Sequence, residues 1–110
     1  MQNIVGDATI FHTNIGANTN FFASNLIPSV VPCIFRVYVV LSVAGILSVQ
    51  RTNGGTTVAE ILNDNVALVA NTANTFDIIV NAGDSINFQT TGSGTTILEC
   101  SVSEIDTMTG

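Results

Sequence analysis

Hydrophobic and polar residues alternate in short runs over most of the chain, and Gly, Asn and Asp separate the runs. A period of two is typical of β-strands, because successive side chains of a strand point to opposite faces. No segment holds a helical period over three turns. We therefore predict seven strands after residue 32 and one before it, at residues 8–13, 33–43, 46–52, 56–62, 66–70, 75–80, 85–90 and 95–105.

The run from Cys33 to Val43 has the strongest alternation. Its apolar face is expected to lie in the core and comprises Cys33, Phe35, Val37, Val39, Leu41 and Val43. Its other face is only half polar, which favours a strand that is either central in its sheet or covered on both sides. The remaining strands are expected to contribute Leu47, Val49, Phe76, Ile78, Val80, Ile86, Phe88, Leu98, Cys100 and Val102 to the same core.

Two tight turns support antiparallel pairing. Residues 53–55, Asn-Gly-Gly, tolerate positive φ and lie between two alternating runs, as in a β-hairpin. Residues 81–84, Asn-Ala-Gly-Asp, form a second turn of this kind. Eight short strands in 110 residues favour an all-β fold, a single antiparallel β-sandwich of jelly-roll type. An open immunoglobulin-like sandwich is the alternative, but its Cys, Trp, Cys pattern fails because the chain has no Trp.

Residues 14–32 depart from the alternation. Residues 14–20 are polar, whereas residues 21–32 are apolar and contain Pro28 and Pro32, which favour extended backbone. We expect a strand and an extended N-terminal arm in residues 1–32, followed by a β-sandwich domain in residues 33–110. The apolar segment either packs on its own chain or reaches a neighbouring subunit. The candidate residues for assembly through this arm are Phe21, Phe22, Leu26, Ile27, Val30 and Val31.

Charged residues make up 9% of the chain, against about 25% in an average globular protein. The surface is therefore expected to be polar without being ionic. With only Arg36 and Arg51 as strong cations and a net charge of −6, the chain cannot neutralise a row of phosphates, which excludes nucleic acid as a partner. An anionic membrane is disfavoured for the same reason. The apolar stretch at residues 30–49 is rich in β-branched residues, which favour strands over a membrane helix.

The chemically reactive residues do not form a recognisable catalytic or metal-binding pattern. His12 is the only histidine, and a metal site needs several converging ligands. The carboxylate pairs Asp77 with Asp84 and Glu60 with Asp64 flank turns, where Asp commonly caps its own backbone. The glycine-rich turns are not followed by a helix, as a phosphate-binding loop requires. We therefore expect a protein that is not an enzyme, with no cofactor, no metal and no small-molecule substrate.

Cys33 and Cys100 both lie in alternating apolar runs, which favours two buried thiols. A single disulfide between them is the alternative. The first seven residues have neither a basic region nor an apolar stretch, so no secretory signal is expected.

Three segments, FRVYVVLSVAGILSVQRTNGGTTV, ALVANTANTFDIIVNAGDSINFQ and TTILECSVSEI, resemble the small β-sandwich decoration (cement, or head accessory) proteins on the capsids of tailed viruses. The resemblance spans residues 35–105. It implies a homotrimer on the capsid exterior that contacts the major capsid protein, with residues 1–32 as an arm that clamps neighbouring capsomers. It also implies synthesis in the host cytoplasm and a final location on the virion.

The leading hypothesis is therefore a virion structural protein that decorates and stabilises a capsid. One alternative is an extracellular filament subunit, assembled by donation of a strand from residues 21–35. Another is a β-sandwich module that binds a receptor or carbohydrate, although the chain lacks the Trp residues on which sugars often stack.

Overall fold

The computed structural model describes residues 3–5, 7–29 and 31–105. Strands dominate this part of the chain, and its only helical element is one short 3₁₀ turn, η1. The elements in chain order are β1 (Asn3–Val5), β2 (Asp7–Ile15), β3 (Leu26–Pro28), β4 (Cys33–Leu41), β5 (Leu47–Asn53), β6 (Thr56–Ile61), η1 (Asn63–Asn65), β7 (Asn74–Val80), β8 (Ser85–Thr90) and β9 (Thr95–Ile105).

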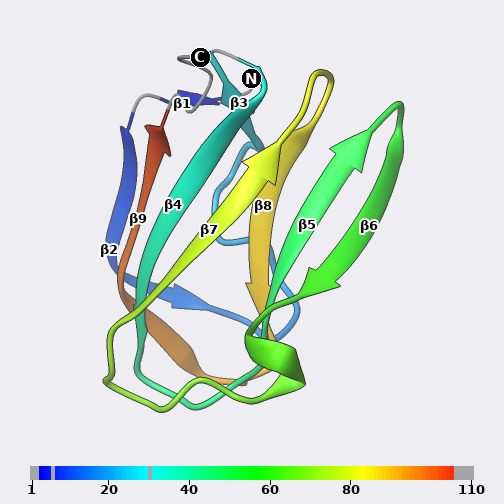
Figure 1. Cartoon of the computed structure of the whole chain (residues 1–110). Coiled ribbons are helices and arrows are strands. Elements are labelled where there is room, and N and C mark those ends of the chain that lie inside the picture. Colours follow the sequence, from blue (N-terminus) through cyan, green and yellow to red (C-terminus); the bar gives the residue numbers. More distant parts are fainter. Residues whose placement is uncertain (1–2, 6, 30, 106–110) are drawn as a thin grey trace.

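The strands form two sheets that enclose one hydrophobic core (Figure 1). One sheet has the order β1-β3-β8-β5-β6 and the other has the order β2-β9-β4-β7. Neighbouring strands are antiparallel except β1 and β3, which are parallel. The prediction of an all-β fold is confirmed, and the arrangement is compatible with a β-sandwich.

The antiparallel pairs are nested along the sequence. β2 pairs with β9, β3 with β8, β4 with β7, and β5 with β6. The second half of the chain therefore retraces the first half in reverse order, and the turn between β5 and β6 lies at the centre of the nesting. Strands from both ends of the sequence consequently lie side by side in the same sheets.

Seven of the eight predicted strands correspond to β2 and β4–β9, with ends that differ by a few residues. The prediction of a strand at residues 66–70 was wrong: this stretch forms only one isolated bridge, from Leu68 to Gly45. Before it, Asn63, Asp64 and Asn65 all adopt positive φ, so the chain bends instead of extending. The sequence did not predict β1 and β3, because three residues are too few to show an alternation.

Alternation also identifies most of the core, with exceptions at Val43 and in β9. The prediction of Val43 as a core residue was wrong, because β4 ends at Leu41 and Val43 is only half-buried. Ile97 is fully buried, whereas Leu98, the predicted core residue, is only half-buried. The register with β4 shifts at this point, because Val40 lies opposite Glu99 but Leu41 lies opposite Ile97. Such a β-bulge adds one residue to a strand and reverses which positions face the core. The prediction of Leu98 as a core residue was therefore wrong.

The apolar N-terminal segment packs on its own chain. Phe21 and Phe22 are each only 5% exposed, and Leu26 is fully buried in the core. Both phenyl rings lie against Phe88, with ring centroids 6.2 and 6.3 Å from its ring. These contacts place the segment in the chain's own core, and the extended arm expected from the sequence is not confirmed.

Backbone hydrogen bonds hold this segment beside β8. The N–H groups of Asn18 and Phe21 donate to the carbonyl groups of Thr90 and Phe88, at 2.8 and 2.9 Å. The buried Asn87 side chain accepts a hydrogen bond from the Phe22 N–H at 3.0 Å and donates one to the Phe22 carbonyl at 2.9 Å. Residues 18–22 therefore occupy the part of the β8 edge that the short strand β3 leaves uncovered.

The other candidate assembly residues differ in exposure. Ile27 is half-buried at β3, and Val31 is 42% exposed. Val30 lies outside the described residues. Of the candidate arm residues whose burial is described, Val31 alone has a largely exposed side chain.

Gly45 provides a test of how tightly the ends of the two sheets pack. A Cβ atom on Gly45 would collide with the Thr90 hydroxyl and would lie 2.8 Å from the Gly92 nitrogen. We expect Gly45→Ala to lower the free energy of unfolding by about 1–3 kcal/mol, the usual cost of overpacking. Urea denaturation would measure this change. Gly16→Ala is the matched control, because its Cβ would meet only the Thr19 hydroxyl, at 3.2 Å; equal effects of the two substitutions would contradict the prediction.

Candidate functional site

The β5–β6 hairpin forms one edge of the five-stranded sheet (Figure 1). Its turn residues Gly54 and Gly55 have φ values of 60° and 82°, as a two-residue type I′ turn requires, so the predicted hairpin is confirmed. Beyond the turn, five residues of β6 are exposed and Glu60 is half-buried. β6 is therefore uncovered on both faces.

Several features that usually protect an edge strand are missing from β6. Its sequence, TTVAEI, contains no Lys and no Pro, and its register with β5 runs without a bulge. Val58 and Ile61 are 54% and 56% exposed, one on each face of the strand. An uncovered apolar edge of this kind is a natural template for pairing with another chain.

The outer face of the same sheet carries no charged side chain on β5, β6 or β8. Its accessible residues on these three strands are Ser48, Gln50, Thr52, Thr57, Ala59, Ile61 and Gln89, whereas Ser85 and Asn87 are buried. A shallow groove of about 360 Å³ crosses this face beside Ala59 and Ile61. Another protein surface could pack here without desolvating a charge, which is the usual condition at the centre of an interface.

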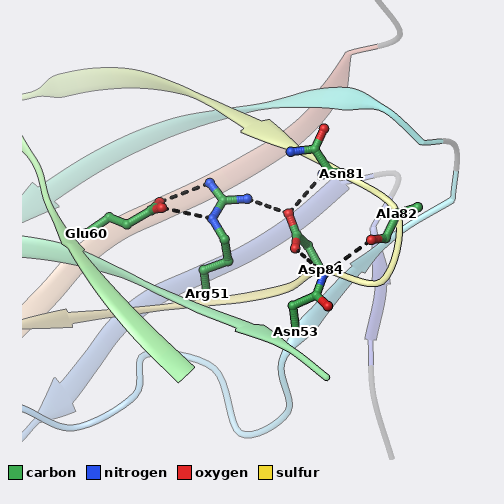
Figure 2. Close-up of polar contacts among 6 residues, drawn as sticks. All are labelled: Arg51, Asn53, Glu60, Asn81, Ala82 and Asp84. Atoms are coloured by element: carbon green, nitrogen blue, oxygen red, sulfur yellow. Dashed lines mark hydrogen bonds and ion pairs between the residues drawn. The ribbon is translucent and has the colours of Figure 1, made fainter. Parts of the chain in front are cut away.

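Arg51 anchors the hairpin from the inner side of the sheet (Figure 2). Its guanidinium group donates to the Glu60 carboxylate through Nε at 3.1 Å and Nη2 at 2.9 Å, and to Asp84 Oδ2 through Nη1 at 2.5 Å. The hydrogen bond to Glu60 contributes most to raising the pKa of Arg51 above its ordinary value. Arg51 thus links β6 to the turn between β7 and β8.

Asp84 is the most enclosed carboxylate of this network, with a side chain only 5% exposed. Besides Arg51, it accepts hydrogen bonds from Asn53 Nδ2 at 2.8 Å and from the Asn81 N–H at 2.9 Å. Burial by itself raises the pKa of Asp84, but the three hydrogen bonds and the charge of Arg51 outweigh it, so the net pKa is lowered. This arrangement holds the Asp84 carboxylate in place and favours its ionised form.

The remaining candidate chemistry is dispersed. Asp77 pairs with Arg36 at 2.9 Å on the outer face of the four-stranded sheet, and the hydrogen bond from Arg36 lowers the pKa of Asp77. Asp64 lies in η1, and His12 is an exposed residue of β2. Over residues 3–5, 7–29 and 31–105, no three His, Cys, Asp or Glu side chains are grouped as metal ligands would be.

Cys33 and Cys100 are buried thiols, not two halves of a disulfide. Cys100 lies opposite Val39, which is six positions from Cys33 along β4. At the usual rise per residue this separation is roughly 20 Å, far beyond the reach of a disulfide. Burial raises the pKa of Cys100 to about 12, so this thiol is unreactive in the folded protein.

Comparison of the chain with protein-family models, with curated proteins and with solved structures finds no match. The resemblance to capsid decoration proteins therefore stays a prediction. In the part of the chain that the structure describes, no helix is long and apolar enough to cross a membrane.

Sequence reasoning identified the two turns of this region but missed the network that joins them. The only relevant signal was the position of Arg51, two residues after Val49, on the side of the strand predicted to face the core. The sequence contains no signal for its partners, because Glu60 comes from the next strand and Asp84 from a turn 33 residues later.

The enclosed Asp84 predicts a specific pH dependence of stability. The pKa of Asp84 is lowered in the folded state, so its ionisation stabilises the fold. This stabilisation is fully present above the ordinary carboxyl pKa of about 3.9. It is lost as the pH falls from about 3.9 toward the lower pKa of the folded state. We expect Asp84→Asn to cost about 2 kcal/mol at neutral pH, the scale of hydrogen bonds to a charged group. The loss should shrink below pH 4 in urea titrations. Asp77→Asn, in the exposed pair, is the control and should have the smaller effect.

The burial of both cysteines predicts how they react with thiol reagents. Neither thiol should react with a disulfide-exchange reagent in the native protein, and both should react once the chain is unfolded, because burial blocks access to both thiols and raises the pKa of Cys100. The measurement is a thiol count by absorbance, with and without denaturant. A count of zero in denaturant without reductant would mean that the two cysteines form a disulfide.

Proposed function

We propose that this protein is a non-enzymatic structural protein of a virion, which decorates and stabilises the capsid exterior as a homotrimer that contacts the major capsid protein. The observation that carries the proposal is the edge strand β6, uncovered on both faces and bordered by an uncharged sheet face. Surfaces of this kind favour association with other protein chains. The resemblance of residues 35–105 to decoration proteins suggests capsid proteins as the partner chains.

The proposal includes a jelly-roll fold. In a jelly roll, a long antiparallel hairpin is rolled up so that eight strands form two sheets of four. The four nested pairs, from β2 with β9 to β5 with β6, have the order that such a roll requires, with β1 as an additional edge strand. Jelly rolls are common in viral capsid proteins, so this strand order supports the proposed role.

Assembly by strand donation receives no comparable support. The segment that a filament subunit would donate, residues 21–35, includes β3 and the start of β4 and contributes Phe21, Phe22 and Leu26 to the core of its own chain. Association through the preformed edge β6 leaves these contacts intact. The proposed assembly therefore uses surfaces that are already exposed.

The test is to measure the molar mass of the full chain by light scattering after gel filtration, and then its binding to viral heads that lack a decoration protein. We expect a trimer that sediments with the heads and saturates them. A monomer that binds no heads would contradict the proposal, and open-ended polymers would favour the filament alternative.

A single charge introduced into the uncharged groove should weaken assembly without unfolding the subunit. Ala59→Lys places an ammonium group on the exposed outer face of β6, where burial in an interface would require its desolvation. We expect trimer formation or head binding to weaken by roughly tenfold or more, since each 1.4 kcal/mol corresponds to a factor of ten. The fold of the individual subunit should stay unchanged.

The matched control is Thr9→Lys. Thr9 is an exposed residue of β2, the edge strand of the other sheet, so this substitution adds the same charge to a different edge. If both variants assemble as well as the original chain, β6 is not the contact surface.

A further inference from the structure

Asn53 is the only asparagine in the sequence that is followed by glycine. This pair matters chemically because the backbone nitrogen of the residue after an asparagine can attack the side-chain amide, and glycine, without a Cβ atom, hinders that attack least. Gly54 and Gly55 are exposed, and no atom outside the turn lies within 4 Å of the position of a Cβ on either residue. The backbone that carries the nucleophile is therefore open to solvent.

We propose that Asn53 is a site of spontaneous deamidation, and that the reaction detaches position 53, at the tip of the β5–β6 hairpin, from the β7–β8 turn. The Gly54 nitrogen forms a bond to Asn53 Cγ, the bond from Cγ to Nδ2 breaks, and Nδ2 leaves as ammonia. The resulting five-membered succinimide is then opened by water at either carbonyl. The products are aspartate and isoaspartate, and neither oxidant nor reductant is needed.

The atom that the reaction removes joins the two turns, beside the ion pair of Arg51 with Asp84. Asn53 Nδ2 donates to Asp84 Oδ1 at 2.8 Å and to the Ala82 carbonyl at 3.2 Å (Figure 2). A carboxylate at position 53 has no proton to donate to either group, and it repels the charge of Asp84 at the same short distance. The modified side chain therefore cannot restore the contact.

The same two hydrogen bonds slow the deamidation of Asn53. They hold the Asn53 amide against Asp84 and Ala82, so the amide must leave them before Gly54 can attack it. Removing the Asp84 carboxylate should free the amide and accelerate the reaction. Asn71 is the internal reference, since it is also exposed but is followed by Thr72, whose Cβ hinders attack.

The first experiment incubates the full chain at mildly alkaline pH and follows each asparagine by peptide mass spectrometry, in which deamidation adds about 1 Da. We expect Asn53 to convert several-fold faster than Asn71, to give two chromatographically distinct products, and to convert faster still in Asp84→Ala relative to Asn71. Asn53→Gln is the control that keeps the amide but cannot form the five-membered ring. Conversion of Asn53 no faster than that of Asn71 would overturn the proposed site.

The second experiment tests the structural consequence. Asn53→Asp reproduces one product, and we expect hydrogen exchange in β5 and β6 to become faster than in the original chain. Unchanged exchange in Asn53→Asp would overturn the proposed detachment, whatever the rate of deamidation.

Discussion

Packing of the two sheets across one apolar core determines where the rest of the molecule lies. Phe35 in the four-stranded sheet and Phe88 in the five-stranded sheet are both fully buried, and their strands come from opposite halves of the sequence. Because the strand pairs are nested, this core is built from both halves of the chain. Phe21 and Phe22 complete it from the N-terminal side, which ties that segment to its own subunit.

The core ends at Arg51, where a cation takes the place of an apolar residue on the inner side of β5. Leu47 and Val49 precede it on that side and are buried. A charge at this position must be neutralised, and Glu60 and Asp84 do so from two different elements. The same contacts hold the hairpin in place, so β6 keeps its position although no second sheet covers it.

The sequence was sufficient where a strand is long enough for its alternation to be read, as in β4 and β5. It failed where local geometry interrupts the alternation: the bulge beside Leu98 moves Ile97 into the core, and residues 66–70 form one isolated bridge in place of the predicted strand. Contacts between residues that are distant in sequence could not be predicted either. The contact of Arg51 with Asp84, and the burial of Phe21 against Phe88, depend on how the sheets close.

The outer faces of the two sheets differ in charge, and this difference orients the proposed assembly. The four-stranded sheet displays Arg36, Asp77 and Glu99, whereas the outer face of β5, β6 and β8 displays only uncharged side chains. A chain with a net charge of −6 repels its own copies least where no charges lie. In a trimer, the uncharged face would therefore be buried between subunits or against the capsid, and the charged sheet would face solvent.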